Sequence, residues 1–280
     1  LSLGLAPTVV AQLIEVIRNP VFAQAEIDRL RDQWVANIAQ EKAQPNSLAL
    51  RLLPLALYGP GHAYGVPFTG SGTAASIASI TRADLVAFKD AWLRPDNAAI
   101  FVVGDTTLAA MLPLLENAFG GWTPPATPRP AKNVADVPLP KSPRVILIDK
   151  PGSPQSLILA GHVMPGLGSD RDVAYEAMNG VLGGSFTARV NMNLREDKGW
   201  SYGARTSLQP ARGVRPFLVQ APVQTDRTGD SLAEIIKELE AIRSSRPIAS
   251  AEAERVIAGL TRGLPGSFEA IARLHHAGYR

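Results

Sequence analysis

The chain has 280 residues, 46% of them hydrophobic and 19% charged, which is enough for a substantial apolar core in one large or two modest domains. The net charge is +3, and the 28 basic and 25 acidic residues are interspersed without a run of one sign. This even distribution of charge argues against nucleic-acid binding. The lack of cysteine and of any apolar run of about eighteen residues excludes disulfides, thiolate zinc sites and a membrane-spanning helix.

The first part of the chain, residues 1–122, has the periodicity of a mainly helical segment. Helices are expected at about residues 5–17, 25–41, 46–58, 81–92 and 107–118. Thr81 and Asp84 have the spacing of a capping box, in which each side chain binds the backbone amide of the other residue. The short apolar run at 98–105 predicts a buried strand.

A proline-rich segment follows at 123–143. It holds seven prolines and almost no apolar periodicity, which is typical of an extended, semi-rigid connector. We therefore expect a domain boundary here, with a first domain at 1–122 and a second at 144–280.

The second part of the chain alternates strands with helices. Strands are expected near residues 144–149, 156–163, 201–208 and 217–223, and helices at 170–182 and 187–194. One more helix is indicated by apolar residues that share a face: Leu232, Ile235, Ile236, Leu239 and Ile242.

One pattern occurs twice. Glu26, Arg29 and Leu30 follow an Ile-Arg-x-Pro joint, and Glu252, Arg255 and Val256 follow a similar joint 226 residues later. Self-similarity at a fixed offset indicates repeated modules, here the end of one and the beginning of the next. Amphipathic helix pairs also share such spacing by chance, so both interpretations stay open.

The densest polar segment lies at 182–204. Two glycines, Gly183 and Gly184, allow a tight turn, after which a helix delivers Arg195 to a turn and Tyr202 opens the next strand. A guanidinium and a phenol brought to one surface suit a carbonyl oxygen that gains negative charge in a transition state. Alternatively, Arg195 pairs with Glu196 or Asp197, and Tyr202 is a half-buried strand residue.

No metal or nucleotide motif accompanies this segment. The glycine pair is not part of a phosphate-binding loop, and no serine lies in Gly-x-Ser-x-Gly. The four histidines stand outside His-Glu-x-x-His and His-x-x-Glu-His arrangements: His62, His162, His275 and His276. We expect no metal ligand and no cofactor-binding residue in this chain.

The run Leu-Gly-Gly-Ser-Phe, continued by Leu-Arg-Glu-Asp-Lys-Gly-Trp-Ser-Tyr-Gly-Ala, resembles the non-catalytic C-terminal half of peptidase family M16, the pitrilysin, insulinase and processing-peptidase-like enzymes. The segments Tyr58-Gly59, His62-Ala63-Tyr64-Gly65 and Phe119-Gly120-Gly121-Trp122 are similar to the end of one module of that family. The resemblance covers nearly the whole chain.

This resemblance implies an α+β metallohydrolase fold of two modules, each an antiparallel or mixed sheet covered by helices. Residues 1–122 would be the end of one module and 144–280 the beginning of the next, both incomplete, so we expect the native protein to extend further. In the family, two bowl-shaped halves close around an unfolded peptide. The partner would be a catalytic half, in the same polypeptide or in a separate subunit.

The resemblance also implies a division of roles. In the family, a His-x-x-Glu-His motif and a downstream Glu bind zinc, but that Glu falls at Ala36 or Asn37 here, so zinc is expected only in the catalytic half. Arg195 and Tyr202 match an Arg and a Tyr, seven residues apart, that reach the substrate carbonyl. The chain is thus expected to be inactive alone. The alternative is a structural or peptide-binding subunit without a role in proteolysis.

The compartment stays open at this stage. A chain without cysteine suits the cytoplasm and an oxidising periplasm equally. A location in the bacterial cell envelope follows only from analogy with relatives.

Overall fold

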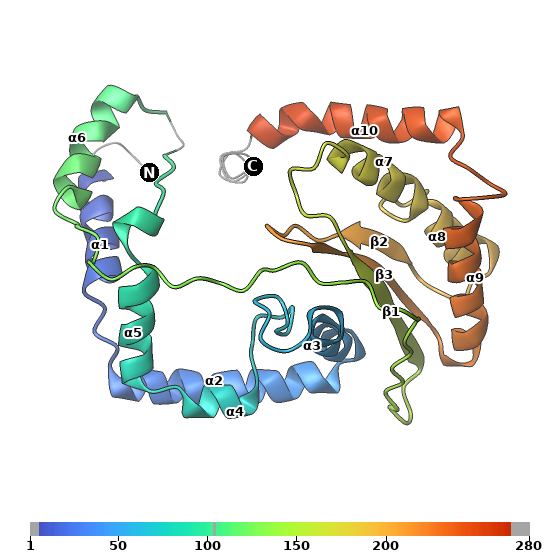
Figure 1. Cartoon of the computed structure of the whole chain (residues 1–280), viewed down its shortest axis with the longest axis horizontal. Coiled ribbons are helices and arrows are strands. Elements are labelled where there is room, and N and C mark those ends of the chain that lie inside the picture. The colour runs from blue at the N-terminus through green and yellow to red at the C-terminus, as the bar shows by residue number, and fades with distance from the viewer. Residues whose placement is uncertain (1–5, 103–104, 270–280) are drawn as a thin grey trace. The chain divides into compact units, whose positions relative to one another are not determined.

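The computed structural model describes residues 6–102 and 105–269 and shows an α+β fold, as expected (Figure 1). The described residues form two compact units. Unit 1 comprises those of Leu1–Asn37, Thr73–Ala131 and Arg262–Arg280, and unit 2 those of Ile38–Gly72 and Lys132–Thr261. His275 and His276 lie outside the described residues.

Unit 1 is built from helices. They are α1 (Ala6–Arg18), the beginning of α2 (Gln24–Ala43), α4 (Ala74–Ser79), α5 (Arg82–Trp92), the 3-10 turn η2 (Pro95–Asn97) and α6 (Leu108–Phe119). The predicted capping box opens α5, where the Thr81 amide donates to Asp84 Oδ2 at 2.8 Å and the Asp84 amide donates to Thr81 Oγ1 at 3.2 Å. These bonds satisfy amides that the first helical turn leaves unpaired.

The strand predicted at 98–105 is wrong for the residues that can be described. Residues 98–102 are not part of any strand, and Ile100 and Val102 are almost half exposed. A strand needs a neighbour that accepts its backbone hydrogen bonds, and the described residues of unit 1 include only helices and turns. The apolar run therefore has the composition of a strand but no neighbouring strand among the described residues.

Unit 2 contains a three-stranded antiparallel sheet with the order β1-β3-β2. The strands are β1 (Gln155–Met164), β2 (Arg205–Leu208) and β3 (Arg215–Gln224). Strand β1 confirms the predicted 156–163, while the predicted 201–208 is regular only from Arg205, with an isolated bridge between Ser201 and Val223.

Helices cover this sheet on both faces (Figure 1). One face carries α7 (Asp172–Leu182), α8 (Arg189–Asn191) and α9 (Thr228–Ala241), and α3 (Pro45–Tyr58) packs against β1 from the other face. The π-helical segment η3 (Met192–Asp197) continues α8, the turn η4 (Thr225–Arg227) precedes α9, and α10 (Ser250–Glu269) follows.

The core of unit 2 lies between β3 and the first group of helices. Along β3, Val219, Ala221 and Val223 alternate toward these helices and are fully buried. Facing them are helical residues of at most 1% exposure: Leu182, Val190, Leu194 and Ile235. Burying each large aliphatic side chain contributes roughly 1.5–3 kcal/mol, which makes this cluster the main source of stability in the unit.

The strand predicted at 144–149 is also wrong. This segment joins no ladder, and Val145 and Leu147 are 85% and 89% exposed. The basic side chains at its two ends are bonded to other segments, because Arg144 donates to the carbonyl of Ala56 and the following Lys150 donates to that of Ala43.

Gly183 provides a test of this packing. A Cβ atom built there would lie 2.5 Å from the amide nitrogen of Thr206, whose N–H donates to the Gly183 carbonyl at 2.9 Å. We expect Gly183→Ala to lower the free energy of unfolding by about 1–3 kcal/mol, because backbone must move to admit the methyl group. Urea denaturation of the purified chain measures this effect.

Gly259→Ala is the matched control. Gly259 lies inside α10, and a Cβ atom built there would have no neighbour within 4 Å, so alanine there should raise stability by about 0.5–1 kcal/mol through helix propensity. Equal changes in the two variants would contradict the close approach at Gly183.

Candidate functional site

The candidate site begins where α7 ends. Gly184 leaves no room for a side chain, since a Cβ there would lie 2.6 Å from Asn179 Nδ2. The buried Thr206 hydroxyl donates to Asn179 Oδ1 at 2.8 Å, which ties the end of α7 to strand β2. The two glycines therefore let the chain turn back tightly against the sheet, as the sequence predicted.

The helix that carries Arg195 changes its hydrogen-bond pattern before it ends. It starts as α8 and widens into the π-helical η3, where the Lys198 amide donates to the Asn193 carbonyl at 3.0 Å. Gly199, with a φ of 65°, then terminates it in a conformation that favours glycine. Short π-helical segments within helices occur frequently at functional sites.

Arg195 and Tyr202 are brought together by this turn. The guanidinium carbon of Arg195 lies 5.0 Å from the centre of the Tyr202 ring and 4.6 Å from that of Phe186. Each cation–π contact contributes about 0.5–1 kcal/mol at an exposed site, so two of them restrict where the guanidinium points. The sequence predicted the Arg195–Tyr202 encounter but missed Phe186.

The alternative interpretation of Arg195 and Tyr202, an ion pair and a half-buried strand residue, is confirmed only for Arg195. Arg195 Nε does lie 3.3 Å from Glu196 Oε1, which is one of the ion pairs considered from the sequence. Tyr202, however, is 83% exposed and precedes the regular part of β2, so it is not a half-buried strand residue. Its hydroxyl makes no hydrogen bond to any described residue and remains available to a ligand.

Asn191 fixes the loops on either side of this pair. Its buried amide donates to the Phe186 carbonyl at 2.7 Å and accepts a bond from the Ala204 amide at 3.0 Å. One side chain thus holds both the loop before the helix and the loop after it. An asparagine within a helical pattern gave no sign of this role, because caps, turns and surface positions favour the same residue.

A partly buried ion pair anchors the start of the same helix. The guanidinium of Arg189 donates to both carboxylate oxygens of Glu252, at 2.9 and 2.6 Å, and to the carbonyls of Arg246 and Pro247. Hydrogen bonds from Arg189 lower the pKa of Glu252 from 4.5 to about 2. The first turn of α10 is thereby linked to the helix that presents Arg195.

Next to the Arg195–Tyr202 pair lies an open pocket of about 470 Å³, which we call the arginine pocket. Two of its lining residues, Arg195 and Arg205, are cationic, and no acidic residue is among those that line it in the described chain. The remaining lining residues are Gly183, Gly184, Ser185, Phe186, Asn191, Gly203, Ala204, Gln220 and Pro222.

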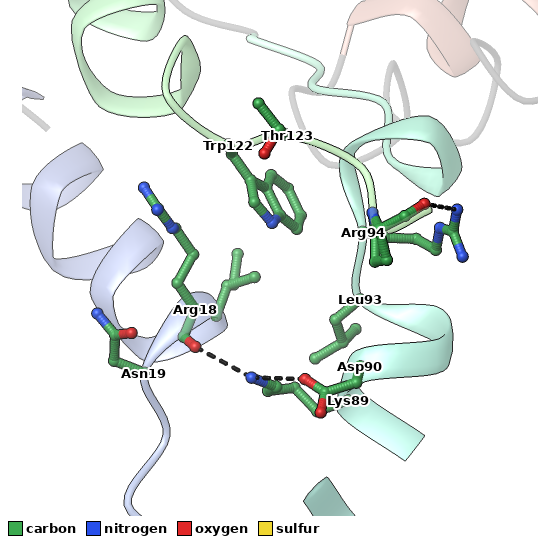
Figure 2. Close-up of a pocket in the computed structure, with 10 residues that line it drawn as sticks. Arg18, Asn19, Lys89, Asp90, Leu93, Arg94, Trp122 and Thr123 are labelled. Atoms are coloured by element: carbon green, nitrogen blue, oxygen red, sulfur yellow. Dashed lines mark hydrogen bonds and ion pairs between the residues drawn. The ribbon is translucent and has the colours of Figure 1, made fainter. Parts of the chain in front are cut away.

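A smaller hollow of about 230 Å³ lies in unit 1 (Figure 2). Several of its polar side chains are bonded to other residues of the unit. Lys89 donates to the Arg18 carbonyl at 3.3 Å and pairs with Asp90 at 2.9 Å, while Arg94 forms two bonds to Asp96.

No group of three or more metal-ligating side chains was found among residues 6–102 and 105–269. His62 stacks on Tyr58 with ring centres 4.8 Å apart, and its Nε2 lies 3.1 Å from the carbonyl of Ala135. His162 packs near Phe217. These donors are separate and engaged in packing, so they do not fit a zinc site. Within the same described ranges, no helix is long and apolar enough to span a membrane.

The sequence matches the family described as the peptidase M16 inactive domain over residues 79–260. A zinc protease of Mycobacterium tuberculosis, itself described as uncharacterized, is 25% identical over 278 residues, covering 96% of this chain and 61% of that protein. The chain thus spans only part of this relative's length.

Two solved structures share the fold. The peptidase M16 inactive domain from Pseudomonas fluorescens aligns with a TM-score of 0.78 and 22% identity, over 92% of this chain and 61% of that one. A protease from Helicobacter pylori aligns with a TM-score of 0.88 and 18% identity, over 98% and 66% of the two chains.

The Arg189–Glu252 pair predicts how stability depends on pH. Because the folded-state pKa of Glu252 lies below its unfolded value, the pair stabilises the fold above about pH 4.5, and this contribution is lost as the pH falls toward 2. Glu252→Gln should lower the free energy of unfolding by about 2–4 kcal/mol at pH 7 and flatten its pH dependence in this window. Urea titrations at several pH values measure both effects.

Glu254→Gln, an exposed change on the same helix, is the control and should alter stability by less than about 0.5 kcal/mol. A Glu252→Gln chain that retains the native pH dependence between 5 and 2 would rule out this ion pair as its source.

Proposed function

The chain belongs to the M16 peptidase family, in the part described as the inactive domain, and we propose that it is the non-catalytic half of a zinc metallopeptidase. In this proposal it closes over a peptide substrate bound by a catalytic half. The observation that carries the proposal is the contact between Arg195 and Tyr202 at an open pocket.

The chemistry of the pair supports this role. A guanidinium can only donate hydrogen bonds and a phenol hydroxyl donates readily, so both suit an oxygen that becomes negatively charged. Preorganised donors of this kind stabilise such charge strongly once water is excluded. The ring of Phe186 contacts the guanidinium, and the Tyr202 hydroxyl is not consumed by the fold.

The metal would belong to the other half. The described histidines do not fit a zinc site, and Ala36 or Asn37 stands where the family's downstream Glu would fall. The relative from Mycobacterium tuberculosis is named a zinc protease, and this chain matches only 61% of it. We propose that the catalytic half lies either in the same polypeptide or in a separate subunit.

The two-module interpretation belongs to the same proposal, with 1–122 as the end of one module and 144–280 as the beginning of the next. The helix pairs α1/α2 and α9/α10 support it. Helix α2 begins at Gln24 and α10 begins at Ser250, 226 residues later, which is the offset of the repeated sequence pattern. A duplicated unit would produce helices that begin at the same offset as the matched sequence patterns.

The decisive experiment compares peptide hydrolysis by this chain alone, with zinc supplied, and after addition of the presumed catalytic half. Hydrolysis only in the mixture is expected. Hydrolysis by the chain alone would mean that it contains its own catalytic centre, and none in either sample would favour a structural or peptide-binding role.

Variants of the pair test its part in the reaction. In the complete assembly, Arg195→Ala or Tyr202→Phe should lower turnover by on the order of a hundredfold to a thousandfold, because one donor to the reacting oxygen is lost. Tyr202→Phe keeps the ring against Arg195, so it isolates the hydroxyl. Turnover and zinc content are measured together, and the zinc content should not change.

Arg243→Ala, an exposed charge removal after α9, controls for a general effect of net charge and should leave turnover near the native value. Native turnover in both Arg195→Ala and Tyr202→Phe would exclude the proposed role of the pair.

A further inference from the structure

Arg205 is the second cation of the arginine pocket, and the fold does not neutralise it. It stands at the start of β2, where it is exposed, and it forms no ion pair with any residue in the described part of the chain. Its guanidinium bonds instead to a neutral side chain, because Arg205 Nε and Nη2 donate to Gln220 Oε1 at 2.9 and 2.6 Å.

The neutral partner is itself held in place. Gln220 lies directly opposite Arg205 in the β2–β3 register, and its amide nitrogen donates to Asn46 Oδ1 from α3. This bond turns the Gln220 oxygen toward the guanidinium. The series of hydrogen bonds from Asn46 through Gln220 to Arg205 therefore orients the positive charge without neutralising it. The guanidinium keeps further N–H donors for another acceptor.

The alternation of the sheet explains why this charge faces the pocket. Val219 and Ala221 point into the core, so Gln220 and Pro222 point to the opposite face, where both line the pocket with Arg205. Across the pocket stand Phe186 and the two glycines, which provide an apolar wall and backbone that a ligand can approach closely.

We propose that the arginine pocket binds a carboxylate of the peptide substrate, with Arg205 as the residue that recognises it. The carboxylate would be an acidic side chain or the C-terminal carboxylate, both of which match the planar fork of a guanidinium. Arg195 is less suited to this task because its guanidinium contacts two rings and Glu196.

This inference rests on the proposed function for the peptide nature of the ligand, but its test is separate from hydrolysis. The affinity of this chain is measured by fluorescence anisotropy for a labelled ten-residue peptide series in which one glutamate occupies each position in turn. The same series carries glutamine instead of glutamate, and each member is made with a free and an amidated C-terminus.

We expect at least one carboxylate-bearing peptide to bind the native chain about tenfold more tightly than its neutral counterpart, the scale of one exposed charge-assisted contact. Arg205→Gln should remove this difference and leave the affinity for the neutral peptide unchanged, whereas Arg205→Lys should retain part of it. Arg243→Gln is the matched control outside the pocket and should behave as the native chain.

The two carboxylate sources give different results. Loss of the preference on exchange of glutamate for glutamine identifies a side chain, and loss on amidation identifies the C-terminus. Equal or absent binding of charged and neutral peptides by the native chain would overturn the inference, as would an equal weakening of both by Arg205→Gln. Hydrolysis in the mixture with the catalytic half would still support the proposed function in that case.

Discussion

The candidate site depends on the burial of one face of the helix at 189–197. Val190 and Leu194 enter the core against β3 at no more than 1% exposure, which fixes the rotation of the helix about its axis. Arg195 follows Leu194 directly and must therefore point away from the core, toward the loops that carry Phe186 and Tyr202. Hydrophobic packing in this way determines where a polar group is presented.

Polar contacts fix what packing leaves free. Apolar packing alone would still allow the helix to slide along its axis or to fray at its ends. Two buried side chains oppose these movements through bonds to different segments. Arg189 binds Glu252 and two carbonyls at the beginning of α10, and Asn191 binds the loops at Phe186 and Ala204. Buried polar groups that are fully hydrogen-bonded contribute to a single arrangement because each alternative would leave them unpaired.

Local patterns of the sequence predicted much of this architecture. The capping box at Thr81 and the strand β1 depend on residues close in sequence, and the structure contains both. The apolar face predicted for α9 is present in part, because Ile235 is buried in the core while Ile236 is 46% exposed. The runs at 98–102 and 144–149 failed because an apolar run records strand propensity and not whether a neighbouring strand is available.

The site itself was predictable only in part, for a related reason. The spacing of Arg195 and Tyr202 within one turn-containing segment allowed them to reach one surface, and the resemblance to the peptidase family favoured that interpretation. Phe186, Asn191 and Arg205 act through partners on other elements, and Arg205 depends on Gln220 and, through it, on Asn46, 159 positions away in the chain. A lone strand arginine has the same sequence signature when it is simply solvated.

The unneutralised charge of Arg205 makes physical sense in an open pocket. While the pocket holds water, a guanidinium is well solvated and its charge costs the fold little, and the neutral Gln220 orients it without competing for an anion. A peptide that fills the pocket would remove that water. The two cations would then favour a carboxylate over a neutral group, since none of the described residues that line the pocket is acidic. Selectivity would thus arise once a bound peptide has displaced the solvent that screens the charge.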